Sequence, residues 1–142
     1  MDSYYDTAQR MYKSAKILHN NSEYHNACYL AGYVLECYSK IVVGMSYPLT
    51  HQELSKEFSH DLEKLRKELD YILASSSISA HIRNLRAECP TIISGQFKWN
   101  PIKRYIQDRD RWNQANSNNY QSEVEIVMTE IARMKLNLTH LI

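Results

Sequence analysis

The stretch from Ala27 to Lys40 carries the residues whose types and spacing favour recognition chemistry. At 100° per residue on a helix, its small and aliphatic residues form one stripe and four others lie opposite: Tyr29, Tyr33, Glu36 and Lys40. A helix with an aromatic second face is typical of one that contacts a partner. The second stripe therefore predicts an interface with a second copy of the chain or with a nucleotide. The alternative is that the tyrosines pack beneath short helices of the same chain.

The spacing of Glu36 and Lys40 also predicts an i, i+4 ion pair. Such a pair contributes about 0.3 to 0.5 kcal/mol if it is exposed. Two histidines, His51 and His60, stand at predicted helix starts, where backbone N–H groups collect and attract anions. We therefore expect either histidine to contact an anion or a nucleotide, with ordinary polar capping as the alternative.

A basic segment lies further along the chain. Between His81 and Trp112, seven Lys and Arg residues stand against three acids, although the whole chain has a net charge of only +1. Cations interleaved with aromatic rings predict contacts with the phosphates and bases of RNA or a nucleotide: Lys98, Lys103, Arg104, Tyr105, Arg109 and Arg111. The alternative is that Trp99 and Tyr105 pack into the fold while the arginines pair with neighbouring aspartates.

Several classes of protein lack support in this sequence. It has no Gly-rich phosphate loop, no dinucleotide-binding fingerprint and no zinc or dimetal signature, so we expect no metal and no cofactor. The three cysteines (Cys28, Cys37 and Cys89) predict reduced thiols, because the first two point to nearly opposite sides of one helix. The longest mostly apolar run, 27–35, is too short to cross a bilayer, and no basic-then-apolar leader is visible. We expect a cytoplasmic protein that does not bind membranes.

Apolar residues recur at spacings of three and four through nearly the whole chain, which predicts an all-α protein. The expected helices cover about 3–19, 22–43, a short segment begun by Thr50, 62–72, 78–85 and 121–141. Ser22 and Ser59 are expected to cap two of them, and 113–119 is expected to be a polar loop. These segments predict an up-and-down bundle of four long helices with one or two short inserted helices, forming a single domain over 1–142.

Three segments together resemble the HEPN family of small helical bundles. Residues 26–40 read NACYLAGYVLECYSK and resemble the second helix of that family. Residues 59–65 begin with SHDL and resemble the start of its third helix, and the KRY of residues 103–105 resembles the element before its last helix. The three matches occur in the family's order and cover most of the chain.

The resemblance implies a bundle of four to five helices that usually dimerises and acts near RNA or nucleotides. Many members belong to toxin–antitoxin or phage-defence systems and sit beside a small nucleotidyltransferase partner. Other members are metal-independent ribonucleases that use an Arg and a His separated by four to six residues. In such an enzyme the His acts as general acid and base, and the Arg stabilises charge on the reacting phosphate.

Arg133 and His140 are the one pair that matches this ribonuclease spacing, with six residues between them. A pair of this kind is expected about once by chance in this composition, and Met134 follows the Arg where the family has a polar residue. Arg83 has the polar follower Asn84 but no His in range. We therefore expect a HEPN-like nucleotide- or RNA-associated binding or partner module without a well-placed nuclease motif. The alternatives are a ribonuclease toxin that uses Arg133 and His140, and a helical interaction module with no nucleic-acid role.

Overall fold

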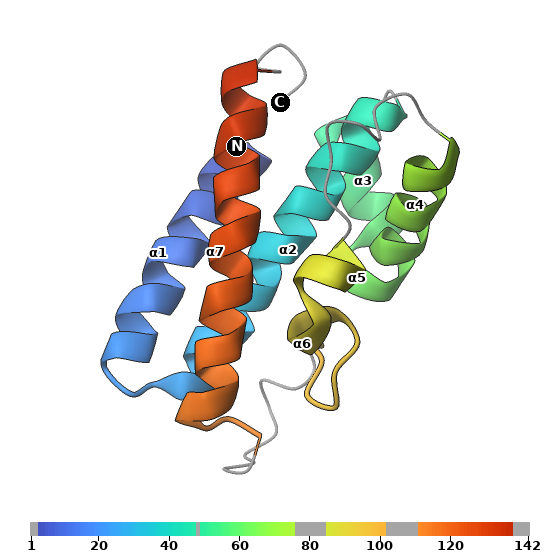
Figure 1. The fold of residues 1–142 in the computed structure, drawn as a ribbon. Helices are drawn as coiled ribbons and strands as arrows, with labels where there is room; N and C mark the ends of the chain where they lie inside the picture. Colours follow the sequence, from blue (N-terminus) through green and yellow to red (C-terminus); the bar gives the residue numbers. More distant parts are fainter. Residues whose placement is uncertain (1–2, 48, 76–84, 102–110, 138–142) are drawn as a thin grey trace.

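A computed structural model describes residues 3–47, 49–75, 85–101 and 111–137. The helices, in chain order, are α1 (Tyr4–Asn20), α2 (Tyr24–Ser46), α3 (His51–Phe58), α4 (Leu62–Ser75), α5 (Leu85–Glu88), α6 (Pro90–Ile93) and α7 (Gln114–Asn137). No strand occurs in these ranges, so the described part of the chain is all-helical, as the periodicity predicts. The arrangement is a helical bundle (Figure 1).

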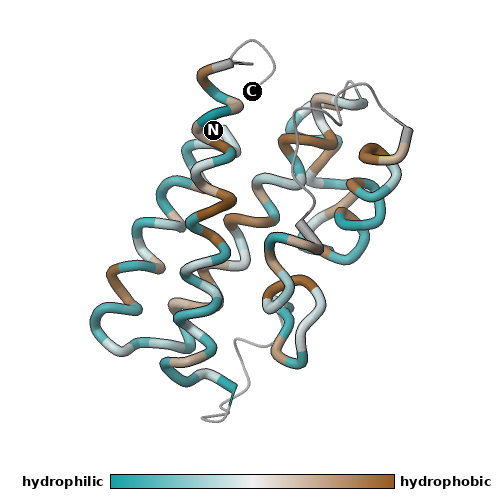
Figure 2. The backbone as a smooth tube through the Cα atoms, in the orientation of Figure 1, coloured by the Kyte–Doolittle hydropathy of each residue, from teal (hydrophilic) through white to brown (hydrophobic). Residues whose placement is uncertain are grey.

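Helix α2 is the centre of the bundle and packs against α1, α7 and α4, with α3 beside its C-terminal half (Figure 1). Nearly every residue of α2 from Ala27 to Val43 is buried. The outer helices α1 and α7 carry hydrophilic turns between hydrophobic ones (Figure 2), as expected for helices that expose one side. The core therefore lies around α2, and what touches α2 decides which of its polar residues are accessible.

Gly32 fixes the position of the segment that follows α6. A Cβ atom at Gly32 would lie 2.0 Å from Nε1 of Trp99, so only glycine leaves room for the indole. The same Nε1 donates a hydrogen bond to the carbonyl oxygen of Tyr29 at 2.9 Å. Trp99 is 5% exposed and holds its loop against α2.

The predicted polar loop at 113–119 is wrong, because α7 begins at Gln114. Asn113 caps this start by accepting the N–H of Asn116 on Oδ1 at 2.9 Å. Ser117 is fully buried, with its Oγ 2.7 Å from Nδ1 of His19. These tertiary contacts outweigh the weak helix propensity of asparagine.

The predicted cap at Thr50 is confirmed, since its hydroxyl accepts the N–H of Glu53 at 3.1 Å. The caps predicted at Ser22 and Ser59 are wrong, because both residues have positive φ angles, 62° and 47°. Asp61 instead accepts the N–H of Lys64 at 3.0 Å at the start of α4. The predicted helix at 78–85 falls mostly outside the described residues.

The three cysteines are free and buried. Burial is the largest cause that raises the pKa of each thiol, to about 12. None of the helices in the described ranges combines the length and the apolar character needed to cross a membrane.

Candidate nucleotide groove between α1, α2 and α3

The second stripe of α2 lines a cavity of about 610 Å³, which we call the α1–α3 groove. Residues of α1, α2 and α3 and the start of the α4 segment form it: Tyr4, Thr7, Arg10, Met11, Tyr29, Leu30, Tyr33, Glu36, Cys37, Lys40, His51, Ser55 and His60. All four residues of the predicted stripe are present, together with both histidines that the sequence marks as anion contacts. The groove therefore gathers charged and aromatic side chains from four separate segments.

Glu36 is the central charged residue of the groove and is only 4% exposed. It accepts a hydrogen bond from Nζ of Lys40 at 2.8 Å, and Nδ1 of His60 lies 3.0 and 3.1 Å from its two oxygens. The predicted ion pair with Lys40 is present, but the two side chains are 6% and 4% exposed. The contribution of about 0.3 to 0.5 kcal/mol that an exposed pair makes does not apply here, because α1 and α3 cover this side of α2.

The cover over Lys40 consists of Tyr4 and His51. Their rings are stacked with centroids 4.1 Å apart, and the hydroxyl of Tyr4 donates to the carbonyl oxygen of His51 at 3.3 Å. Nζ of Lys40 lies 5.7 Å from the centroid of the Tyr4 ring, a cation–π contact. Burial, with help from nearby Cys37 and Glu36, raises the pKa of Tyr4 to about 12, so its hydroxyl stays protonated at neutral pH.

Aromatic rings form the other end of the groove. The hydroxyl oxygens of Tyr29 and Tyr33 are 2.7 Å apart. The Tyr33 ring meets His60 edge-on at 5.4 Å and Trp99 at 5.1 Å between centroids. Both tyrosines are half-buried, so each ring is partly packed and partly presented to the groove.

This geometry changes what the stripe can contact. Glu36 and Lys40 are buried inside a single chain, so they do not lie on a flat outer face that a second copy could cover. They form the floor of a cavity that suits a smaller ligand. The homodimer remains a prediction from the sequence.

A second cavity of about 550 Å³ shares His60 with the groove in its lining. Its lining includes Lys98 and Trp99 from the loop after α6, and Arg66 from α4. Arg66 is held by carboxylates on both sides, with Nη1 2.9 Å from Asp70 and Nη2 bonded to Glu63. Among the six residues predicted to contact RNA or a nucleotide, Lys98 is thus the described one that lines this cavity.

Arg111 is turned into the fold. It is 9% exposed and donates from Nη2 to the carbonyl oxygen of Lys98 at 2.6 Å. Its guanidinium lies 4.9 Å from the centroid of Trp112, a cation–π contact. Trp99 therefore follows the packing alternative. The aspartates expected to pair with Arg111 lie outside the described residues, as do Lys103, Arg104, Tyr105 and Arg109.

Arg133 lies on α7 and does not line the groove. Its Nε donates to Glu130 at 3.1 Å and its Nη2 also bonds that carboxylate. Glu130 is 4% exposed, and the hydrogen bond to it is the largest cause that raises the pKa of Arg133. Its proposed catalytic partner, His140, lies outside the described residues.

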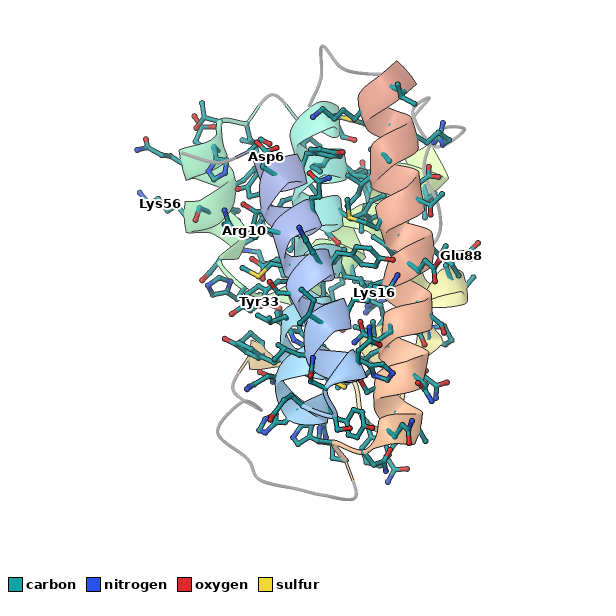
Figure 3. All side chains as sticks on the ribbon, turned by 90° about the vertical axis from the view of Figure 1, so that its left-hand side faces the viewer. Asp6, Arg10, Lys16, Tyr33, Lys56 and Glu88 are labelled. Atoms are coloured by element: carbon teal, nitrogen blue, oxygen red, sulfur yellow. The ribbon has the colours of Figure 1, made fainter. Side chains whose placement is uncertain are left out.

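Sequence reasoning missed the contribution of α1. Tyr4 and Arg10 line the groove, but the sequence marks α1 only by its apolar spacing. Figure 3 shows Arg10 and Tyr33 on the side of α1 that faces α3, and Lys16 on the side that faces α7. Only the packing of α1 on α2 brings these residues to the stripe.

The described residues hold no group of three His, Cys, Asp or Glu side chains that could bind a metal ion. What they hold is two cations, two imidazoles, one carboxylate and several aromatic rings around one cavity. Comparisons with known proteins found no family model, no curated protein and no solved structure that matches this chain significantly.

Proposed function

We propose that this chain is a HEPN-like, nucleotide- or RNA-associated binding module, and that it binds a nucleotide unit in the α1–α3 groove. The single observation that carries the proposal is the convergence of Tyr29, Tyr33, Glu36, Lys40 and His60 on one cavity. Bases stack on aromatic rings, while cations and imidazoles bind phosphates.

The two segments that meet in the groove are also two of the three that resemble HEPN domains. Residues 26–40 supply the stripe, and residues 59–65 supply His60. The contact between Glu36 and His60 joins them across 24 positions of the chain. A shared groove gives a physical reason for both motifs to occur in one sequence.

The charge of the groove favours an anionic ligand. Two cationic residues, Arg10 and Lys40, and one carboxylate, Glu36, line the groove, which gives a net charge of +1 with both histidines counted as neutral. Low-dielectric walls strengthen the attraction between such a site and a phosphate. The resemblance adds the expected setting: a homodimer in a toxin–antitoxin or phage-defence system, with a small nucleotidyltransferase as partner. The cysteine pattern adds the expectation of a cytoplasmic protein.

Equilibrium binding tests the proposal directly. The purified protein is titrated with AMP by calorimetry and with a fluorescently labelled single-stranded RNA by anisotropy, at low and at moderate salt. We expect binding that weakens with salt and competition between AMP and the RNA for one site.

A matched pair of variants on α1 locates the site. Arg10→Ala removes a cation that lines the groove, and Lys16→Ala removes one from the same helix on the side facing α7 (Figure 3). Binding should weaken several-fold in Arg10→Ala and stay unchanged in Lys16→Ala. No binding of either ligand by the wild-type protein at low salt would overturn the proposal and favour an interaction module with no nucleic-acid role.

A further inference from the structure

Lys40 has more hydrogen-bond donors than the described residues use. A lysine ammonium presents three N–H donors, and here one of them bonds Glu36 at 2.8 Å. The described residues supply no second acceptor, and the lysine is only 3% exposed. Buried donors of this kind are normally satisfied, so an oxygen atom from a ligand would complete the site.

There is also space for that oxygen. A smaller cavity of about 190 Å³ adjoins the groove, and the two share Tyr4, Lys40 and His51 in their linings. Lys40 therefore borders free volume on two sides although it is buried from bulk solvent. The imidazole of His51 lines the same volume and carries a ring N–H that can donate a hydrogen bond.

We propose that the groove binds a nucleoside monophosphate in one orientation, with the phosphate at Lys40 and His51, a ribose hydroxyl at Glu36 and the base beside Tyr33. This inference rests on the proposed function and names its ligand and its contacts. Three residues of α2, spaced by three and four positions, each meet one chemical part of the ligand.

The helix spacing matches the ligand. At 1.5 Å per residue, Tyr33 and Lys40 are separated by about 10 Å along the axis of α2, which is about the span of a nucleoside monophosphate from base to phosphate. Glu36 lies between them, where the sugar would be. A carboxylate accepts hydrogen bonds from ribose hydroxyls, and Glu36 uses only part of its acceptor capacity on Lys40 and His60.

Calorimetry with AMP and adenosine separates the phosphate contact from the contacts of the base and sugar. The wild-type protein should bind AMP about tenfold or more tightly than adenosine, because only AMP reaches Lys40 with a charge-assisted hydrogen bond. Lys40→Met should weaken AMP binding by about the same factor and leave adenosine binding nearly unchanged. Lys56→Met is the matched control, since Lys56 is exposed on α3 and points away from the groove (Figure 3).

The wild-type protein alone keeps the inference testable if Lys40→Met fails to fold. Inorganic phosphate should compete with AMP, and 2′-deoxy-AMP should bind more weakly than AMP. Equal affinity of the wild type for AMP and adenosine would overturn the orientation while the proposed function stands. Failure of the wild type to bind AMP, adenosine and RNA alike would overturn the proposed function itself.

Discussion

Nδ1 of His60 lies 3.0 and 3.1 Å from the two carboxylate oxygens of Glu36, across 24 positions of the chain. The Glu36 side chain is 6% exposed, whereas that of His60 is 56% exposed. A buried carboxylate thus fixes the orientation of an imidazole at the edge of the groove, and it ties the start of α4 to α2. The same carboxylate holds Lys40, so one residue organises both charged partners.

The first prediction concerns Glu36→Gln. The substitution leaves the ammonium of Lys40 buried without its carboxylate, and breaking a buried pair in this way costs about 3 to 5 kcal/mol in the free energy of unfolding. Urea unfolding followed by circular dichroism measures the loss. The double variant Glu36→Gln, Lys40→Met should lose less than the two single variants added together, because it leaves no uncompensated charge.

Glu57→Gln is the matched control, because Glu57 pairs with Lys64 at 2.9 Å on the surface, where the side chains are 62% and 46% exposed. An exposed pair contributes about 0 to 1 kcal/mol. Equal losses in Glu36→Gln and Glu57→Gln would contradict the buried network described above.

The second prediction concerns Gly32→Ala. The new Cβ would lie 2.0 Å from Nε1 and 2.1 Å from two ring carbons of Trp99, so the indole must move. Overpacking of this kind costs about 1 to 3 kcal/mol or more, and the hydrogen bond from Trp99 to Tyr29 would be lost. Thermal unfolding and the tryptophan emission maximum measure the two effects.

Gly44→Ala provides the comparison on the same helix. Its Cβ would meet Cδ1 of Leu54 at 3.1 Å, and this flexible side-chain end can give way. Alanine also favours the helix by up to about 1 kcal/mol. The second prediction fails if Gly44→Ala destabilises the protein as much as Gly32→Ala does.

Periodicity alone was enough to predict the all-helical class and the face of α2 that carries Tyr29, Tyr33, Glu36 and Lys40. Local side-chain rules also predicted the cap at Thr50. These features depend on residues close together in the chain, where helical geometry sets the relative positions.

The features that sequence reasoning missed depend on contacts between distant segments. Glu36 and Lys40 are buried because Tyr4 and His51 cover them. The sequence around Tyr4 and around His51 does not indicate that these two residues pack over α2. The polar stretch at the start of α7 is helical because Ser117 is buried against His19. Arg111 packs inward on Trp112, although the excess of basic residues in its segment predicted that it would contact phosphates or bases.

The third prediction concerns Arg133→Gln. Its guanidinium bonds the buried carboxylate of Glu130, so the substitution should lower the free energy of unfolding by about 1.5 to 3 kcal/mol. Lys13→Gln, on the exposed side of α1, should have almost no effect. Because Arg133 lies outside the groove, we expect neither the wild type nor the variant to degrade RNA in the presence of a chelator. Cleavage by the wild type that disappears in Arg133→Gln would favour the ribonuclease alternative.

The fourth prediction concerns pH and Glu123. This carboxylate is 8% exposed and accepts the backbone N–H groups of Thr91 at 3.0 Å and Ile92 at 3.1 Å, which caps α6. Burial is the largest cause that raises its pKa above the ordinary 4.5, against the opposing effect of these hydrogen bonds. The folded state therefore holds the proton more tightly than the unfolded state does. This contribution to stability is complete below about pH 4.5 and is lost as the pH rises through the raised pKa.

Glu123→Gln keeps an acceptor oxygen for Thr91 and Ile92 but cannot titrate. The free energy of unfolding of the wild type, measured relative to this variant by urea unfolding at a series of pH values, should fall as the pH rises from 4.5. Glu123→Ala removes the acceptor and should lose about 1 to 3 kcal/mol throughout, because two buried N–H groups lose their partner. Glu125→Gln, exposed on the same helix, should show neither effect. The opposite result is a wild type that becomes more stable relative to Glu123→Gln as the pH rises. It would mean that the hydrogen bonds from Thr91 and Ile92 outweigh burial in setting the pKa of this carboxylate.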